Sequence, residues 1–116
     1  MNLFEKYGGV RAVHDIVVMF YDRLLDDETL ADYFADSDMQ ALVQHQTNFI
    51  SSVMGGPGGV SDARLRSSHQ SLNIDMNAFQ RTANILAQSM RDCGVEDIDV
   101  ATIIDLVATK AELIVE

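Results

Sequence analysis

The chain has one cysteine, one proline and few basic residues. A single cysteine excludes an intrachain disulfide framework and a cysteine-rich zinc site. Eight lysines and arginines against 18 acidic residues give a formal net charge of −10, whereas nucleic-acid binding needs a basic surface. The longest unbroken apolar run extends from Ile16 to Tyr21, far short of the roughly 20 residues of a membrane helix. We therefore expect neither a nucleic-acid partner nor a membrane span.

The N-terminal sequence also lacks the basic segment and following apolar stretch of a signal peptide. A length of 116 residues predicts one domain over residues 1–116, and an apolar fraction of 47% is enough to build its core. We expect a cytoplasmic protein that is a monomer.

The distribution of glycine and apolar residues predicts an all-α fold. No Asn-Gly or Asp-Gly hairpin signal and no alternating β-branched run is present, whereas apolar residues recur at helical spacing. Asp38 and Asp75 are the expected N-caps of two long helices, and Gly94 is an expected C-terminal cap. The predicted helices cover residues 2–7, 10–25, 29–34, 39–54, 63–70, 76–91 and 97–114.

Two polar residues occupy apolar helix faces. Gln46 lies near the centre of the apolar stripe of helix 39–54, and Tyr21 lies on the stripe of helix 10–25. A buried amide without a partner costs about 1–3 kcal/mol, so each side chain requires a polar contact inside the protein. Either the two side chains form a pair that contacts a small polar ligand, or a Tyr–Gln hydrogen bond simply satisfies the core.

Two histidines are candidate metal ligands. His69 has Leu65 and Leu72 at helical spacing, and such a histidine is either an ordinary core residue or a ligand. A haem iron needs only one proximal histidine. His45 lies at the edge of its stripe, where it would be a surface residue, a contact to a haem propionate or a sixth iron ligand.

Several short stretches, taken together, resemble the group I truncated haemoglobins, the two-over-two globin family. The resemblance covers nearly the whole chain. The stretches that carry it are Leu3 to Gly9, Phe20 to Arg23, Tyr33-Phe34, Asp38-Met39, His45-Gln46, Phe49, Gly55-Gly56-Pro57, His69 and Leu72.

The resemblance implies a helical sandwich around a haem, with a very short first helix and a mostly irregular loop before the proximal helix. His69 would be the proximal iron ligand, and Phe34 would pack on the porphyrin. Tyr21 and Gln46 would donate hydrogen bonds to a bound diatomic ligand, whose negative polarisation such donors stabilise. Leu42 stands where many relatives keep a distal glutamine.

The resemblance also implies further contacts to the haem. Arg64 and Arg66 would offset the two propionates. No C-x-x-C-H motif is present and no histidine follows His69, so the expected cofactor is non-covalent haem b. The expected haem-lining residues are Phe34, Leu42, His45, Gln46, Phe49, Leu72 and Phe79.

Three positions depart from the family pattern. Val60 and Asp62 stand where relatives often have tyrosine and glycine, so we expect a less ordered loop there. His45 stands where a lysine is frequent, and some cyanobacterial relatives use a histidine there as a sixth ligand. We expect His45 to ligate iron when no external ligand is present and to leave when O2 or CO arrives.

The expected function is reversible binding of O2 and of other diatomics, NO and CO. Its expected physiological chemistry is NO dioxygenation to nitrate, supported by an unidentified reductase, or O2 handling. One alternative is a bis-histidyl haem protein, with His45 and His69 on the iron, acting in redox chemistry or gas sensing. Another is a haem-free helical interaction module.

Overall fold

The structure is a computed structural model that describes residues 2–34, 37–56 and 75–109. These residues contain helices and no strand, which confirms the predicted all-α class. No helix among them is long and apolar enough to cross a membrane. The elements are α1 (Leu3–Lys6), α2 (Val10–Asp26), the 3-10 helix η1 (Ala31–Phe34), α3 (Met39–Val53), α5 (Met76–Asp92) and α6 (Asp97–Ala108).

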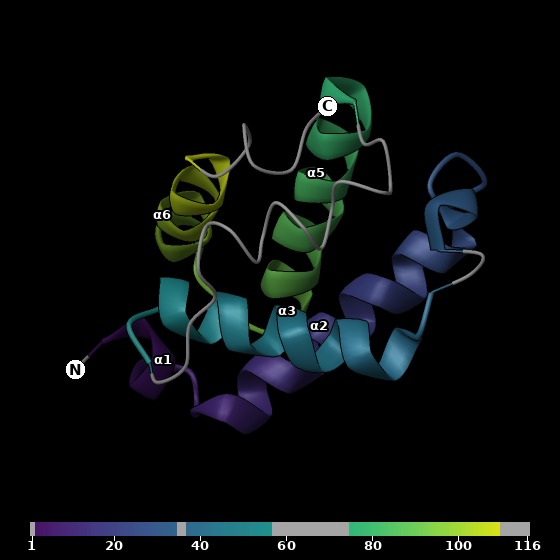
Figure 1. Ribbon diagram of the computed structural model, residues 1–116. Coiled ribbons are helices and arrows are strands. Elements are labelled where there is room, and N and C mark those ends of the chain that lie inside the picture. The colour runs from purple at the N-terminus through teal and green to yellow at the C-terminus, as the bar shows by residue number, and fades with distance from the viewer. Residues whose placement is uncertain (1, 35–36, 57–74, 110–116) are drawn as a thin grey trace.

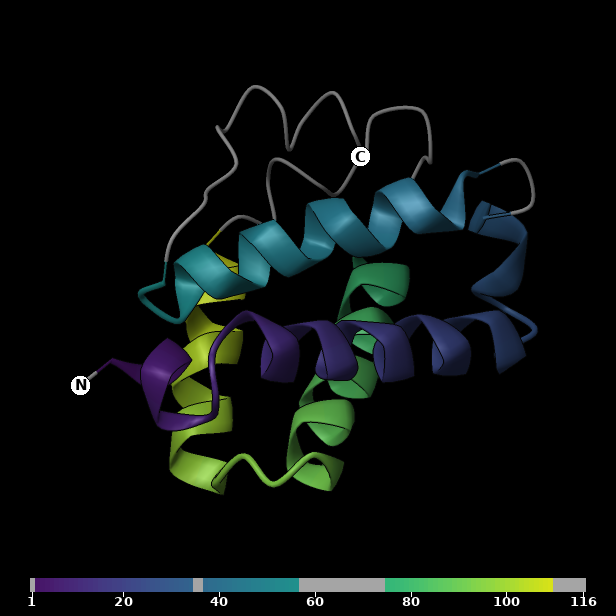
Figure 2. The ribbon, with the colours of Figure 1, turned by 90° about the horizontal axis from the view of Figure 1, so that it is seen from below.

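The long helices form two antiparallel pairs (Figures 1 and 2). α2 and α3 run side by side in opposite directions, and the α5–α6 pair crosses them. α2 packs against both α3 and α5. Its apolar stripe is buried almost completely, as the spacing of these residues predicts. The buried residues of α2 are Val13, Ile16, Val17, Phe20, Tyr21 and Leu24.

The helix ends follow the predicted capping residues. The Asp38 side chain accepts a hydrogen bond from the Ala41 amide at 3.3 Å, and Asp75 accepts one from Ala78 at 2.8 Å. Gly94 follows the end of α5 with φ of +95°, a conformation that other residues rarely adopt. These contacts fix where α3 and α5 begin and where α5 ends.

Two predicted helices differ from the observed ones. The range 29–34 becomes a 3-10 helix that begins at Ala31, because the Asp27 carboxylate accepts the amides of Thr29 and Leu30 and holds them in a turn. α6 covers Asp97–Ala108 with Thr109 as its C-cap, and residues 110–114 of the predicted range lie outside the described residues. The predicted helix 63–70 and the loop before it lie outside them as well.

Candidate functional site

The apolar side chains of α3 cover a wide arc of the helix, which has a buried part and a half-buried part. The buried part includes Ile50 and Met54. The half-buried part, which forms the half-buried face of α3, includes Met39, Leu42 and Val53 within the described residues. Among the described helices, α3 packs mainly against α2 and to a smaller extent against α6, and Leu42 and Val53 stay half-buried. The half-buried face of α3 is therefore the first candidate for a cofactor or ligand.

Tyr21 and Phe34 meet beside this region. The Tyr21 ring lies edge-on to Phe34 at 5.9 Å between ring centroids, and it also contacts Phe20 at 5.0 Å. Tyr21 is only 7% exposed. Among the described residues, none forms a hydrogen bond with the Tyr21 hydroxyl. The structure thus brings two predicted site residues together and leaves a largely buried phenol without a polar contact there.

Burial controls the protonation of this phenol. Removal from water disfavours the charged phenolate, so burial raises the pKa of Tyr21 well above its ordinary value of 10.0. The hydroxyl therefore keeps its proton at neutral pH. It is an available hydrogen-bond donor in apolar surroundings.

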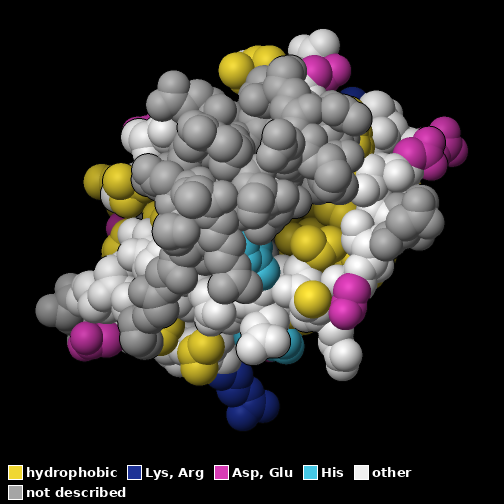
Figure 3. All heavy atoms as spheres, in the orientation of Figure 1, with side chains coloured by type: hydrophobic (Ala, Val, Ile, Leu, Met, Phe, Trp, Pro, Cys, Tyr) yellow, Lys and Arg dark blue, Asp and Glu magenta, His cyan; other side chains and the backbone are white. Residues whose placement is uncertain are grey.

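Gln46 and His45 lie on α3 at the half-buried face and its edge. Both side chains are half-buried. No hydrogen bond joins Tyr21 to Gln46, so the interpretation in which the two merely satisfy each other is wrong for this structure. The half-buried side of α3 therefore combines apolar area with an amide and an imidazole. In the orientation of Figure 1, Figure 3 shows histidine and hydrophobic side chains close together on the surface.

The other predicted contacts divide into two groups. Leu42 is half-buried on α3, whereas Phe49 and Phe79 are 3% and 9% exposed and belong to the hydrophobic core. The remaining predicted residues lie outside the described part of the chain. They are Val60, Asp62, Arg64, Arg66, His69 and Leu72.

Two buried hydroxyls on α3 were not expected from the sequence. Thr47 and Ser51 are 6% and 2% exposed, more buried than Gln46. The Thr47 hydroxyl donates to the Val43 carbonyl at 2.7 Å, and the Ser51 hydroxyl has no hydrogen-bond partner among the described residues. An interpretation with one apolar stripe on α3 predicts the burial of neither residue. The helical spacing of Val43, Thr47 and Met54 places them on one side of α3, and this pattern could have indicated the buried side.

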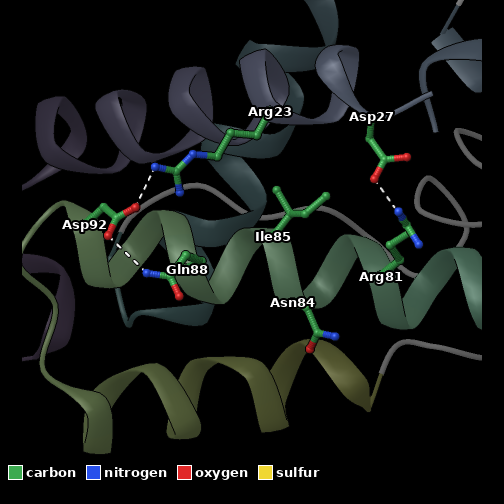
Figure 4. A pocket seen from close by; sticks show the side chains of 7 residues that line it. All are labelled: Arg23, Asp27, Arg81, Asn84, Ile85, Gln88 and Asp92. Atoms are coloured by element: carbon green, nitrogen blue, oxygen red, sulfur yellow. Dashed lines mark hydrogen bonds and ion pairs between the residues drawn. The ribbon is translucent and has the colours of Figure 1, made fainter. Parts of the chain in front are cut away.

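A surface groove of about 430 Å³ between α2 and α5 is a second concave site (Figure 4). Its charged groups already pair across the groove. Arg23 contacts Asp92 at 2.5 Å, and Arg81 contacts Asp27 at 2.7 Å. Ile85 lies between the two ion pairs, as Figure 4 shows. Because the guanidinium and carboxylate groups satisfy one another, the groove presents no unpaired charge for a ligand.

The features around α3 fit a haem. A flat apolar macrocycle would cover the half-buried face, and a small ligand on its iron would meet the Tyr21 hydroxyl, which has no partner within the described residues. Leu42 and Phe34 would contact the macrocycle, and Gln46 would be the second donor. Described histidines, cysteines and carboxylates form no group of three or more that would hold a metal ion without such a macrocycle.

Comparisons with known proteins agree with this fit. The family model "Bacterial-like globin" matches residues 2–115. A group 1 truncated hemoglobin of Synechocystis sp. is 33% identical over 97% of this chain and 97% of its own length. The 2/2 hemoglobin of Synechococcus sp., solved in the cyanomet state with covalently attached heme, is 28% identical with a TM-score of 0.84, covering 98% of both chains.

A further structure supports the fold alone. The truncated hemoglobin of Tetrahymena pyriformis in its Fe(III) form is 24% identical with a TM-score of 0.89, covering 99% of this chain and 98% of that one. Globin membership implies a haem cofactor and binding of diatomic gases such as O2. The chain belongs to the bacterial-like globin family, as a truncated haemoglobin of group I.

Proposed function

We propose that the chain holds a non-covalent haem b through His69 and reversibly binds O2, NO and CO, with NO dioxygenation to nitrate as its physiological chemistry. The observation that carries the proposal is the buried Tyr21 phenol, which has no hydrogen-bond partner in the described residues and lies edge-on to Phe34. When bound, ferrous haem supplies the O2 site and the electron with which O2 and NO become nitrate. An unidentified reductase would then return that electron.

The residues of this chain bind and orient the ligand. Tyr21 is protonated at neutral pH, and burial raises its pKa further, so it donates a hydrogen bond toward a negatively polarised ligand. Gln46 is the second donor, held on the half-buried face of α3. Leu42 and Phe34 keep the surroundings apolar, which strengthens each hydrogen bond relative to water. His69, Leu72, Arg64 and Arg66 would supply the proximal ligand, an apolar contact and the charges for the propionates.

Replacing Tyr21 by phenylalanine tests this role. A hydrogen bond to a charged acceptor contributes about 1.5–3 kcal/mol, so Tyr21→Phe should speed O2 dissociation about ten- to a hundredfold. Carbon monoxide is less polar when bound and serves as the internal control, because its dissociation should change less. Flash photolysis and stopped-flow measurements give both rates. Equal changes for the two gases would contradict the hydrogen-bond role of Tyr21.

A further inference from the structure

The Tyr21 ring lies against two other aromatic rings. Phe34 meets it edge-on, with an angle of 85° between the ring planes, and Phe20 lies beside it with an angle of 58°. The phenol oxygen lies on the long axis of the ring, so it moves only when the side chain swings about the Cα–Cβ bond or when the backbone moves. Neighbouring rings restrict that swing. The position of the Tyr21 hydroxyl therefore depends on where these two rings lie.

The two neighbouring rings are held in different ways. Phe20 precedes Tyr21 in α2 and is only 2% exposed, so it moves with the same helix as Tyr21. Phe34 belongs to η1, a 3-10 helix of four residues, none of which is buried. Such a short element is not stable alone. The position of the Phe34 ring must therefore be fixed by contacts outside η1.

Asp27 fixes the turn that leads from α2 into η1. Its Oδ1 atom accepts the Thr29 amide at 2.8 Å and the Leu30 amide at 3.2 Å. Its backbone carbonyl accepts the amide of Ala31, the first residue of η1, at 2.8 Å. Leu30 is 1% exposed and anchors the turn in the core. An aspartate that accepts amides of the following residues holds a turn in one conformation, so the place where η1 begins is fixed.

We propose that Phe34 is a positioning residue for the distal donor: supported by the Asp27 turn, its ring restrains the Tyr21 side chain and so directs the hydroxyl toward the diatomic ligand. The inference rests on the proposed function, because it takes Tyr21 as the donor. An edge-on aromatic pair contributes a factor of about two to ten in an equilibrium constant beyond the area that it buries. We expect loss of the Phe34 ring to change O2 dissociation by that factor.

A double-mutant cycle in the haem-loaded protein tests whether Phe34 acts through Tyr21. Phe34→Leu keeps an apolar side chain but removes the ring edge. It should speed O2 dissociation about two- to tenfold and raise the infrared stretching frequency of bound CO, because the donor is less well directed. In the Tyr21→Phe background the same substitution should change both values much less, since no hydroxyl remains to be directed. Equal changes in the two backgrounds would overturn the positioning role.

Tyr33→Leu is the matched control, because it removes the other aromatic ring of η1. Tyr33 is half-buried, and its ring makes no aromatic contact with Tyr21 among the residues that the structure describes. The O2 rate and the CO frequency should stay near those of wild type. Changes as large as those in Phe34→Leu would show a general loosening of η1 and would overturn the specific role of Phe34.

Two substitutions of Asp27 test the support of Phe34 without altering any ring. Asp27→Ala removes the acceptor of the two turn amides and should shift both values in the direction of Phe34→Leu, by a smaller amount. Asp27→Asn keeps an acceptor oxygen and loses only the charge beside Arg81, which Figure 4 shows across the groove, so both values should stay near wild type. Wild-type values in Asp27→Ala, or equal shifts in the two variants, would refute the part given to the turn.

Tyr21→Phe alone separates this inference from the proposed function. If it leaves both the O2 rate and the CO frequency unchanged, Tyr21 is not a donor and the proposed function loses the observation that carries it. If Tyr21→Phe has its expected effect and Phe34→Leu has none, the positioning role of Phe34 alone is refuted.

Discussion

The three tyrosines show how one residue type takes different roles in one molecule. The Tyr7 hydroxyl contacts the Asp99 carboxylate and accepts the Glu96 amide at 3.1 Å. Tyr33 is half-buried, and its hydroxyl makes no hydrogen bond with the described residues. Tyr21 is the most buried of the three and also lacks such a bond there. Tyr21 also has its ring against Phe34, so it is the tyrosine that we expect to donate to a ligand.

Among the described histidines, His45 is the one whose predicted role as an iron ligand can be tested by a single substitution. It is half-buried at the edge of the candidate face of α3, and ligation of iron would require movement of that helix. We expect His45→Leu to change the unliganded ferrous spectrum from low-spin six-coordinate to five-coordinate. CO binding should become faster, because no internal ligand has to leave first.

The control for His45→Leu is His14→Leu, which removes an exposed histidine of α2. It should leave the spectrum and the CO rate as in wild type. An unchanged spectrum and rate in His45→Leu would show that His45 does not ligate iron and would leave Tyr21 and Gln46 as the distal residues.

The sequence predicted part of the site because its signals were local. Tyr21 and Gln46 are polar residues on apolar stripes, and that contrast can be read from spacing alone. The edge contact between Tyr21 and Phe34 joins two elements, so no spacing within one helix predicts it. Thr47 and Ser51 escaped notice because small hydroxyls occur on buried and exposed faces alike. Their burial depends on how the other helices pack against α3.

At the scale of elements, helix ends show the same division between local and long-range causes. The caps of α3 and α5 lie within three residues of the groups they satisfy, so sequence spacing predicted them. Glu96, the N-cap of α6, makes no side-chain cap. The Tyr7 hydroxyl accepts the Glu96 amide instead, from a position 89 residues earlier. No local pattern predicts such a cap.

Removing this long-range cap gives an element-scale prediction. Tyr7→Phe loses the acceptor for the Glu96 amide and the contact to Asp99, and should lower the free energy of unfolding by about 1–2 kcal/mol. Urea unfolding followed by circular dichroism measures the change. Tyr33→Phe is the matched control, because it removes a hydroxyl that makes no hydrogen bond within the described residues. Equal losses in the two variants would show that Tyr7 does not act as a cap.

At the scale of the whole molecule, charge links stability to pH. Ion pairs and hydrogen bonds hold the pKa of three carboxyl groups below the ordinary value of 3.8: Asp27 beside Arg81, Asp92 beside Arg23, and Asp99 beside Lys6 and Tyr7. A carboxyl group with a lowered pKa in the folded state stabilises the protein above its unfolded pKa. That contribution is lost as the pH falls through the folded pKa.

Asp27→Asn tests this linkage, since asparagine keeps an acceptor for the Thr29 amide but removes the charge beside Arg81. The variant should melt at a lower temperature than wild type near neutral pH. The difference should shrink as the pH falls below about 4 and vanish below the folded pKa of Asp27. Asp22→Asn, an exposed aspartate of α2 without an ion pair among the described residues, is the control. A melting difference for Asp27→Asn that stays constant with pH would contradict the assignment.

The two ion pairs between α2 and α5 have a geometric consequence. Arg23 and Asp27 are about 6 Å apart along α2 and its C-cap, whereas their partners Asp92 and Arg81 are about 16 Å apart along α5. Because these lengths differ, the two ion pairs restrain the rotation of α5 relative to α2 as well as the distance between the helices. If α5 rotated about one ion pair, the other ion pair would lengthen. Exposed ion pairs add little free energy individually. Together these two pairs add a restraint on the angle at which α5 crosses α2 to the one that the packed side chains provide.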